Sequence, residues 1–343
     1  MTRSTPSHRS RATGRVTLAD VASLAGVSPI TVSRALRGEK TVDPILAQRV
    51  KDAAAQLHYV PDPAARALAS RHSSHVAILI PMLSNALFVD LLEAVQRTLR
   101  PAGYQTLIGI THYNADEEEQ LLREQLLHRP SGLLMTGLDQ NAATRELMAL
   151  SGIPCVHLME LSDHPGQYSV GFSQRDAGEA ITRHLLDRGR RRIAFAAAQL
   201  DPRTLQRAEG YRRCLQAAGV YDPSLEFMSA QPSSMALGGE LFGQLLERHP
   251  DCDAVFFCND DLAQGGLLAA LRLRIEVPTR IAVAGFNDLS GSDQMLPPLT
   301  TVATPRQAIG ENAAKMLLDL MQGGSPAHHC IDLGFTLRVR QST

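Results

Sequence analysis

Residues 16–36 read VTLADVASLAGVSPITVSRAL, and this stretch decides the class of the protein. Thr17 precedes a run whose apolar residues recur at helical spacing, and Gly26 marks the end of that first helix. Ser28 followed by Pro29 is typical of a second helix start, because serine caps free amides and proline fits the first turn. The stretch therefore predicts two short helices joined by a tight turn.

A third helix and an alanine-rich segment follow this pair. Asp43-Pro44 repeats the cap-and-proline signal and predicts a helix that continues to Leu57. Residues 61–70 read PDPAARALAS, which favours a helix but offers little surface to bury, so a helix there is marginal on its own. We predict a three-helix head over residues 16–60 and a hinge over residues 61–73.

The second helix carries an apolar stripe of Val32, Ala35 and Leu36, which leaves polar residues on its outer side. A helix of this kind after a tight turn is typical of a helix-turn-helix that enters the major groove, and an ordinary helical hairpin is the alternative. Residues 1–73 hold eleven Lys or Arg against five Asp or Glu, whereas the remainder holds 23 against 30. This basic end favours a polyanionic partner such as DNA.

These residues resemble the DNA-binding domain of the LacI/GalR repressors. The elements DVA, AGVS, TVSR and YVP carry the resemblance across residues 16–71, and the likeness covers nearly the whole chain after the first fifteen residues. Residues 104–107, 259–263 and 332–337 are most similar to repressors of gluconate operons. The resemblance implies a homodimer that binds a pseudo-palindromic operator in double-stranded DNA.

The resemblance also implies which residues contact DNA. Arg34 matches a base-contacting position, Pro29 and Ile30 match positions that vary operator choice, and Leu68 matches a residue that wedges into the minor groove. The full implied set is Thr17, Ser28, Pro29, Ile30, Thr31, Ser33, Arg34, Thr41, Ala65, Leu68 and Ala69.

From residue 74 onward, short apolar runs alternate with helical stretches. The predicted strands are residues 76–80, 106–110, 132–136, 155–158, 193–197, 255–258 and 281–284. Such alternation predicts parallel sheets with helices on both faces, and two series predict two doubly wound subdomains. The resemblance implies an α/β body like the periplasmic binding proteins behind the all-α helix-turn-helix head.

The body, residues 74–343, is expected to bind an effector and to form the dimer. We expect an N-subdomain of residues 75–171 and 302–327 and a C-subdomain of residues 172–301 and 328–343. The three crossovers between them are expected at residues 171–173, 300–304 and 326–330.

Polar residues just past the strand ends predict a ligand site between the subdomains, because parallel sheets bind ligands at their carboxyl ends. The candidates are Ser84, Asn85, Phe88, Thr136, Glu160, Arg203, Thr204, Arg207, Asn259 and Asn287. Such groups suit a polyhydroxylated ligand, and an arginine suits a carboxylate. The plainer interpretation is that they are solvated loop residues.

By resemblance, Arg207, Asn259 and Asn287 occupy ligand-contacting positions. Asn287 replaces the aspartate of most relatives, which suggests an anionic effector, although asparagine also binds neutral sugars. We expect gluconate or a keto derivative; a neutral sugar, a sugar phosphate or a purine is the alternative.

Other functional classes find little support in the sequence. No phosphate-binding glycine loop, zinc-protease motif or serine-nucleophile elbow is present, so we expect no enzyme and no cofactor. His328-His329 and Cys330 form a tract that could ligate a metal, but a solvated linker is the favoured interpretation.

The sequence also predicts the compartment in which the protein is found. Residues 1–15 predict a disordered basic arm without the apolar centre of a signal peptide, which argues against a secreted sugar-binding protein. No run is long and apolar enough for a membrane span. Cys155, Cys252 and Cys258 lie in apolar runs and are expected to be reduced core residues, which fits a cytoplasmic protein.

Overall fold

The computed structural model describes residues 16–39, 41–60, 73–83 and 86–343, and the chain separates into two compact units. The first unit ends at Ser73 and the second begins at Ser74. None of the helices in the described ranges combines the length and the apolar character needed to cross a bilayer.

Within its described residues 16–39 and 41–60, the first unit is a bundle of three short helices. They are α1 (Leu18–Ala25), α2 (Pro29–Leu36) and α3 (Pro44–Gln56). The caps are those predicted: Thr17 and Asp20 form a reciprocal capping box, and the Ser28 hydroxyl accepts a hydrogen bond from the Thr31 amide at 3.2 Å. Gly26 ends α1 in the left-handed region, with φ of 63°.

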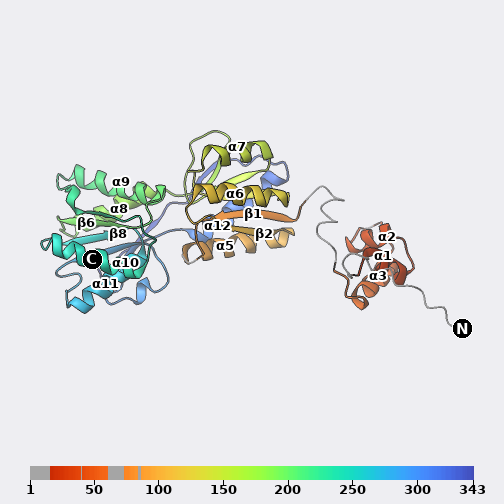
Figure 1. The fold of residues 1–343 in the computed structure, drawn as a ribbon, viewed down its shortest axis with the longest axis horizontal. Helices are drawn as coiled ribbons and strands as arrows, with labels where there is room; N and C mark the ends of the chain where they lie inside the picture. The colour runs from red at the N-terminus through yellow and green to blue at the C-terminus, as the bar shows by residue number, and fades with distance from the viewer. Residues whose placement is uncertain (1–15, 40, 61–72, 84–85) are drawn as a thin grey trace. The chain divides into compact units, whose positions relative to one another are not determined.

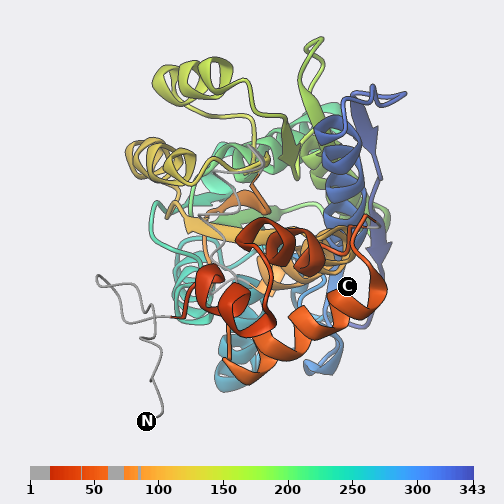
Figure 2. The same cartoon turned by 90° about the vertical axis from the view of Figure 1, so that its right-hand side faces the viewer.

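The second unit begins with a subdomain built on a six-stranded parallel sheet of order β11-β5-β4-β3-β1-β2. Its strands are β1 (His75–Ile80), β2 (Gln105–Ile110), β3 (Gly132–Thr136), β4 (Cys155–Leu158), β5 (Tyr168–Gly171) and β11 (Cys330–Asp332). Its helices are α5 (Ala86–Leu99), α6 (Ala115–Leu127), α7 (Ala142–Ser151) and α12 (Arg306–Met321). In Figures 1 and 2, α6 and α7 lie side by side, and Figure 1 shows α5 and α12 across the sheet from them.

The other subdomain has a six-stranded sheet of order β12-β10-β9-β8-β6-β7. Its strands are β6 (Ile193–Ala197), β7 (Glu226–Met228), β8 (Ala254–Phe257), β9 (Ala282–Asn287), β10 (Thr300–Ala303) and β12 (Thr336–Arg338). Its helices are α8 (Gln174–Asp187), α9 (Pro202–Ala217), α10 (Met235–Arg248) and α11 (Asp260–Leu273). All pairs in this sheet are parallel except that of β12 with β10.

Two of the expected crossovers lie elsewhere. Residues 300–303 are a strand of the second sheet, so the chain returns to the first subdomain only after Ala303. Residues 330–332 pair with β5 in the first sheet, with Ile331 opposite Val170, so the last crossover follows Asp332 rather than falling at residues 326–330. The second segment of the C-subdomain therefore does not begin at residue 328. Short strands were mistaken for linkers, because three or four residues are too few to show a period.

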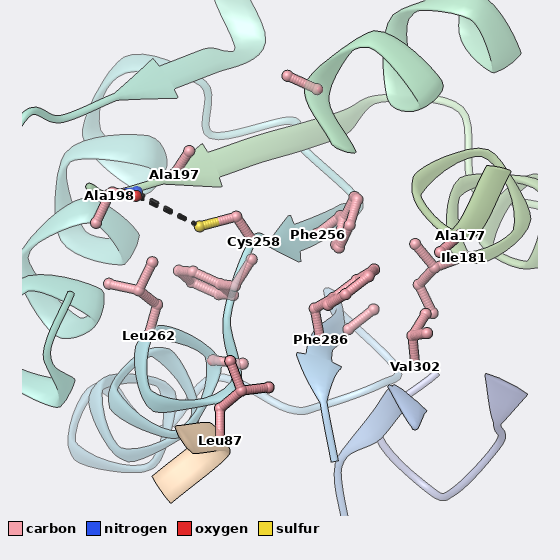
Figure 3. Close-up of a cluster of buried hydrophobic side chains, with 14 of the residues drawn as sticks. Leu87, Ala177, Ile181, Ala197, Ala198, Phe256, Cys258, Leu262, Phe286 and Val302 are labelled. Atoms are coloured by element: carbon pink, nitrogen blue, oxygen red, sulfur yellow. Dashed lines mark hydrogen bonds between the residues drawn. The ribbon is translucent and has the colours of Figure 1, made fainter. Parts of the chain in front are cut away.

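Aromatic and aliphatic side chains fill the core of the second subdomain. Figure 3 shows Phe256 and Phe286 among this cluster, and Leu87 of α5 reaches it from the first subdomain. Cys258 accepts a hydrogen bond from the Ala198 amide at 3.5 Å, and both Cys258 and Cys252 are buried free thiols. Cys155 is free but only half-buried.

Helices α8 and α9 pack at very short distance through two glycines. A Cβ at Gly178 would overlap the carbonyl oxygen of Arg207, and one at Gly210 would overlap that of Arg175. Neither backbone can withdraw without moving its whole helix, so these glycines set how close α9 approaches α8.

We expect Gly178→Ala to lower the free energy of unfolding by about 1–3 kcal/mol, because it overpacks a helix contact made by backbone atoms. Gly243→Ala on α10 is the matched control, since its Cβ would meet no atom within 4 Å. The control should be neutral or more stable by about 0.5–1 kcal/mol, because alanine is the better helix former. Urea unfolding followed by circular dichroism measures both, and equal stability of the two variants would contradict this account.

Candidate functional site

The outer face of α2 presents its residues to solvent. Ile30 is 66% exposed and the Arg34 side chain 54%, whereas Val32 and Ala35 are buried against the other two helices. Thr31 and Ser33 are half-buried, and Ser28 and Pro29 are exposed. An exposed face of this kind on a firmly packed helix is suited to contact with a partner.

Arg34 is held only weakly within its own unit. Its Nε lies 3.7 Å from Glu39 Oε2, and Arg37 approaches the same carboxylate at 2.9 Å. Exposed ion pairs of this kind contribute about 0–1 kcal/mol, so Arg34 is free to change partner.

The remaining predicted DNA contacts are placed differently. The Thr17 hydroxyl donates to Asp20 at 2.8 Å within the capping box, and Thr41 is exposed. Ala65, Leu68 and Ala69 lie outside the described residues, as does most of the predicted hinge, so those assignments stay predictions.

The two subdomains of the second unit meet through Glu160, which follows β4, and through side chains of α9. Glu160 Oε2 lies 3.4 Å from Arg203 Nη1, and Glu160 Oε1 accepts from Gln206 Nε2 at 2.6 Å. Glu160 and Arg203 were both predicted to contact the effector; they contact each other.

A cavity of about 340 Å³ lies beside this contact, between the subdomains. Thr136 and Arg203, two of the predicted effector residues, line it, and sequence reasoning missed Tyr113, Glu118 and Asp139. Burial, assisted by Asp139, raises the pKa of Glu118 to about 7. Burial and Asp201 likewise raise the pKa of Tyr113 to about 12. Three carboxyl groups, those of Glu118, Asp139 and Asp201, therefore line this cavity beside Arg203.

Arg203 has its charge compensated within the protein. Its guanidinium lies 3.1 Å from Asp201, 3.4 Å from Glu160 and 3.9 Å from Asp139. Burial lowers the pKa of Arg203, but Asp201 and Glu160 outweigh it and raise that pKa overall. A further carboxylate would therefore add little to the compensation of the Arg203 charge.

Arg207 is one turn further along α9 and is in the opposite situation. Its Nε donates to Gln174 Oε1 at 2.8 Å, and its Nη1 donates to the Cys258 carbonyl at 2.7 Å and to Asn259 Oδ1 at 2.9 Å. Its guanidinium lies over the Phe286 ring, 3.9 Å from the centroid. No acidic side chain of the described residues forms an ion pair with it, and burial lowers its pKa.

This arrangement excludes one alternative for Arg207, that it braces α9 against Asp201 or Glu209. Asp201 is paired with Arg203, and Glu209 with Arg175 at 3.0 Å. Arg207 is thus a buried cation held by neutral acceptors and an aromatic face, which are weaker compensation than a carboxylate.

Asn287, at the end of β9, forms a cluster with Arg207 and Asn259. Its Nδ2 donates to Asn259 Oδ1 at 3.0 Å, while its Oδ1 is buried and has no hydrogen-bond partner among the described residues. Its φ of 104° is unusual for any residue but glycine. Strain and an unsatisfied buried acceptor together are typical of a ligand site.

Three other predicted effector residues make contacts within the fold. Phe88 is buried in the main core, and Thr204 donates to Asp201 at 3.2 Å. The Thr136 hydroxyl donates to the Leu79 carbonyl at 3.0 Å. Ser84 and Asn85 lie outside the described residues. Gln174, which bridges the Met159 carbonyl and Arg207, was missed because a lone glutamine carries no recognisable pattern.

Comparison with known proteins places these features in a family. Residues 17–62 match the family described as "Bacterial regulatory proteins, lacI family", and residues 182–343 match "Periplasmic binding protein-like domain". The chain is 56% identical over 333 residues to the HTH-type transcriptional regulator GntR of Pseudomonas aeruginosa, covering 97% of each protein. It is 34% identical to the regulator of the same name from Escherichia coli, over 94% of this chain and 97% of that one.

A solved structure agrees with these relatives. The transcription regulator GntR from Chromobacterium violaceum superposes with a TM-score of 0.77 at 51% identity, covering 78% of this chain and 98% of that one. The predicted fold class is confirmed, and relatives of this similarity are transcriptional regulators, not enzymes. Because the likeness to them runs from the capped helices of the head to the end of the second subdomain, the chain belongs to the LacI family of bacterial transcriptional regulators.

Proposed function

We propose that this regulator represses genes of sugar-acid catabolism and that gluconate, or a keto derivative of it, is the effector that changes its affinity for operator DNA. Arg207 carries the proposal, because it is a buried cation without a carboxylate partner among the described residues. Beside it, the buried Oδ1 of Asn287 lacks a donor. A sugar acid supplies both a carboxylate for the arginine and hydroxyl donors for the amide.

A neutral sugar would meet only half of this demand. It could donate to Asn287, but it would leave the Arg207 charge uncompensated in a cleft that already buries it. Arg203 cannot substitute as the carboxylate site without giving up Glu160 or Asp201. The acidic partners of Arg203 therefore direct an anionic ligand towards Arg207.

A thermal-shift screen of the full chain tests the effector. We expect gluconate or 2-ketogluconate to raise the melting temperature in a concentration-dependent way, since a ligand of the folded state stabilises it by mass action. Ribose, a purine base and 6-phosphogluconate are the comparison ligands. Stabilisation by ribose or the purine alone would contradict the sugar-acid assignment.

We further propose that the protein acts as a homodimer on a pseudo-palindromic operator, with its work on chromosomal DNA placing it in the cytoplasm. A two-fold dimer presents two α2 helices, one to each half-site. Fluorescence anisotropy on duplexes from the chain's own promoter region, with and without gluconate, measures operator binding and its response. Equal affinity for operator and scrambled duplex would contradict the repressor assignment.

Arg34 is the residue of α2 with the largest expected effect on operator choice. If it reads a guanine, Arg34→Ala should weaken operator binding by about 1–3 kcal/mol, and most of this loss should appear as lost discrimination against a scrambled duplex. Arg37→Ala is the control, because Arg37 is similarly exposed and shares Glu39 with Arg34 but is not a predicted base contact, so discrimination should be kept. Undiminished discrimination in Arg34→Ala would remove this residue from base reading.

A further inference from the structure

One side chain joins the two subdomains beside Asn287. Arg306 is the first residue of α12, which packs on α5 in the first subdomain. Its Nε donates to Asp90 Oδ2 of α5 at 3.0 Å, and its Nη2 lies 2.9 Å from the same oxygen. Its Nη1 donates to the backbone carbonyl of Asn287 in the second subdomain.

The same guanidinium also meets the next carbonyl along. Nη1 and Nη2 of Arg306 lie 3.4 and 3.3 Å from the Asp288 carbonyl oxygen, and the Arg306 side chain is 15% exposed. Asn287 and Asp288 both have positive φ, at 104° and 51°. Arg306 therefore binds the backbone carbonyls of this strained pair, and the Asp90 carboxylate of α5 binds Arg306.

A continuous set of hydrogen bonds connects this clamp to the candidate carboxylate site. Arg207 donates to Asn259 Oδ1 at 2.9 Å, and Asn287 Nδ2 donates to the same oxygen at 3.0 Å. A ligand that draws Arg207 or Asn287 towards itself must therefore alter the position of the Asn287 peptide. The carbonyl of that peptide accepts the hydrogen bond from Arg306 Nη1.

We propose that Arg306 is a positioning residue that couples effector binding at Arg207 and Asn287 to helix α5. Helix α5 is the relevant end of this coupling because of its place in the chain. It is the first helix after β1, the strand that begins the second unit, and the first unit precedes that strand. Movement of the Asn287 peptide pulls on Asp90 through one planar guanidinium, which transmits orientation better than a flexible ammonium. The proposal rests on the proposed function for the site but not on which ligand fills it.

Arg340 provides a matched control within the second subdomain. Its Nη2 donates to Asp288 Oδ1 at 2.8 Å and its Nη1 donates to the Leu299 carbonyl at 2.7 Å, so it contacts Asp288 of the strained pair without reaching α5. Loss of Arg340 also removes an arginine that holds Asp288, through two side-chain hydrogen bonds, but it breaks no link between the subdomains.

The first experiment compares effector binding with the operator response in the full-length protein. Gluconate affinity is measured by calorimetry, and operator affinity by anisotropy with and without saturating gluconate. Allosteric couplings typically change affinity 5- to 150-fold. We expect Arg306→Gln and Asp90→Asn to bind gluconate within threefold of wild type but to change operator affinity less than twofold on its addition. Arg340→Gln should keep the wild-type response.

Two results of this experiment overturn the proposal. A full wild-type response in both Arg306→Gln and Asp90→Asn would show that the link carries no coupling. A loss of gluconate affinity greater than tenfold in Arg306→Gln would show that Arg306 holds the ligand itself.

A second experiment needs no ligand and remains decisive if wild type ignores gluconate, which would contradict the proposed effector alone. Asn287→Gly removes the side chain at a φ that glycine tolerates. We expect it to change amide hydrogen exchange at residues 89–92 of α5 at least threefold in the wild-type background and not at all in Arg306→Gln. Equal effects in both backgrounds would refute the coupling through Arg306.

Discussion

We expect Arg207→Ala to bind gluconate about 10- to 150-fold more weakly than wild type, equivalent to about 1.5–3 kcal/mol, while still binding operator DNA. The reason is that a charge-assisted bond is lost from a buried cluster whose only cation is this guanidinium. Operator affinity that no longer responds to gluconate should accompany the loss. Calorimetric titration of the folded variant measures the first effect, and anisotropy the second.

Two matched variants on the same helix separate ligand binding from folding. Arg212→Gln removes an arginine of α9 that pairs with Glu226 at 2.6 Å, away from the cluster, and should leave gluconate affinity unchanged. Arg203→Gln leaves Glu160 and Asp201 without their cation, so it should lower stability more than it lowers gluconate affinity. Wild-type gluconate affinity in folded Arg207→Ala would remove this residue from the site.

The two arginines explain how far the site could be predicted. Their position past a strand end predicted both Arg203 and Arg207 as candidates. The resemblance marked Arg207, Asn259 and Asn287 as ligand-contacting positions, and the structure brings these three together. That Arg203 is compensated by Glu160 and Asp139 could not be predicted, because those residues are over 40 positions away in the chain. Pairing across subdomains depends on how two sheets meet, which no local pattern records.

The strands likewise divide into those that the sequence could predict and those that it could not. Strands buried on both faces were predicted to the residue for β3, β4 and β6, since each is a continuous apolar run between turn signals. Strands β7, β11 and β12 have three residues each and lie at sheet edges, where one face or neighbour is missing and apolar character is weak. The capped helices of the head were predicted with their starting residues, because Ser28-Pro29 and Asp43-Pro44 act through local hydrogen bonds.

Phe286 links the core to the proposed effector site, because Arg207 lies over its ring and its ring neighbours Phe172 and Phe256 belong to the apolar cluster. The ring is fully buried, with centroids 6.3 Å from Phe172 and 6.4 Å from Phe256. Its replacement therefore acts on two properties at once, stability through lost packing and ligand binding through the support of Arg207.

We expect Phe286→Ala to lower the free energy of unfolding by about 3–5 kcal/mol, the usual cost of a large cavity in a dense core. Phe286→Leu should cost less than about 1.5 kcal/mol, since it keeps most of the apolar volume, yet it removes the aromatic face beneath the guanidinium. A cation–π contact of this burial contributes about 0.5–2 kcal/mol, so gluconate affinity should fall about 2- to 30-fold in Phe286→Leu. Phe256→Leu, equally buried but not beneath Arg207, should lose similar stability and keep wild-type affinity. Urea unfolding and calorimetry on the three variants decide the matter: if Phe286→Leu and Phe256→Leu bind gluconate equally well, the ring does not position Arg207 for the ligand.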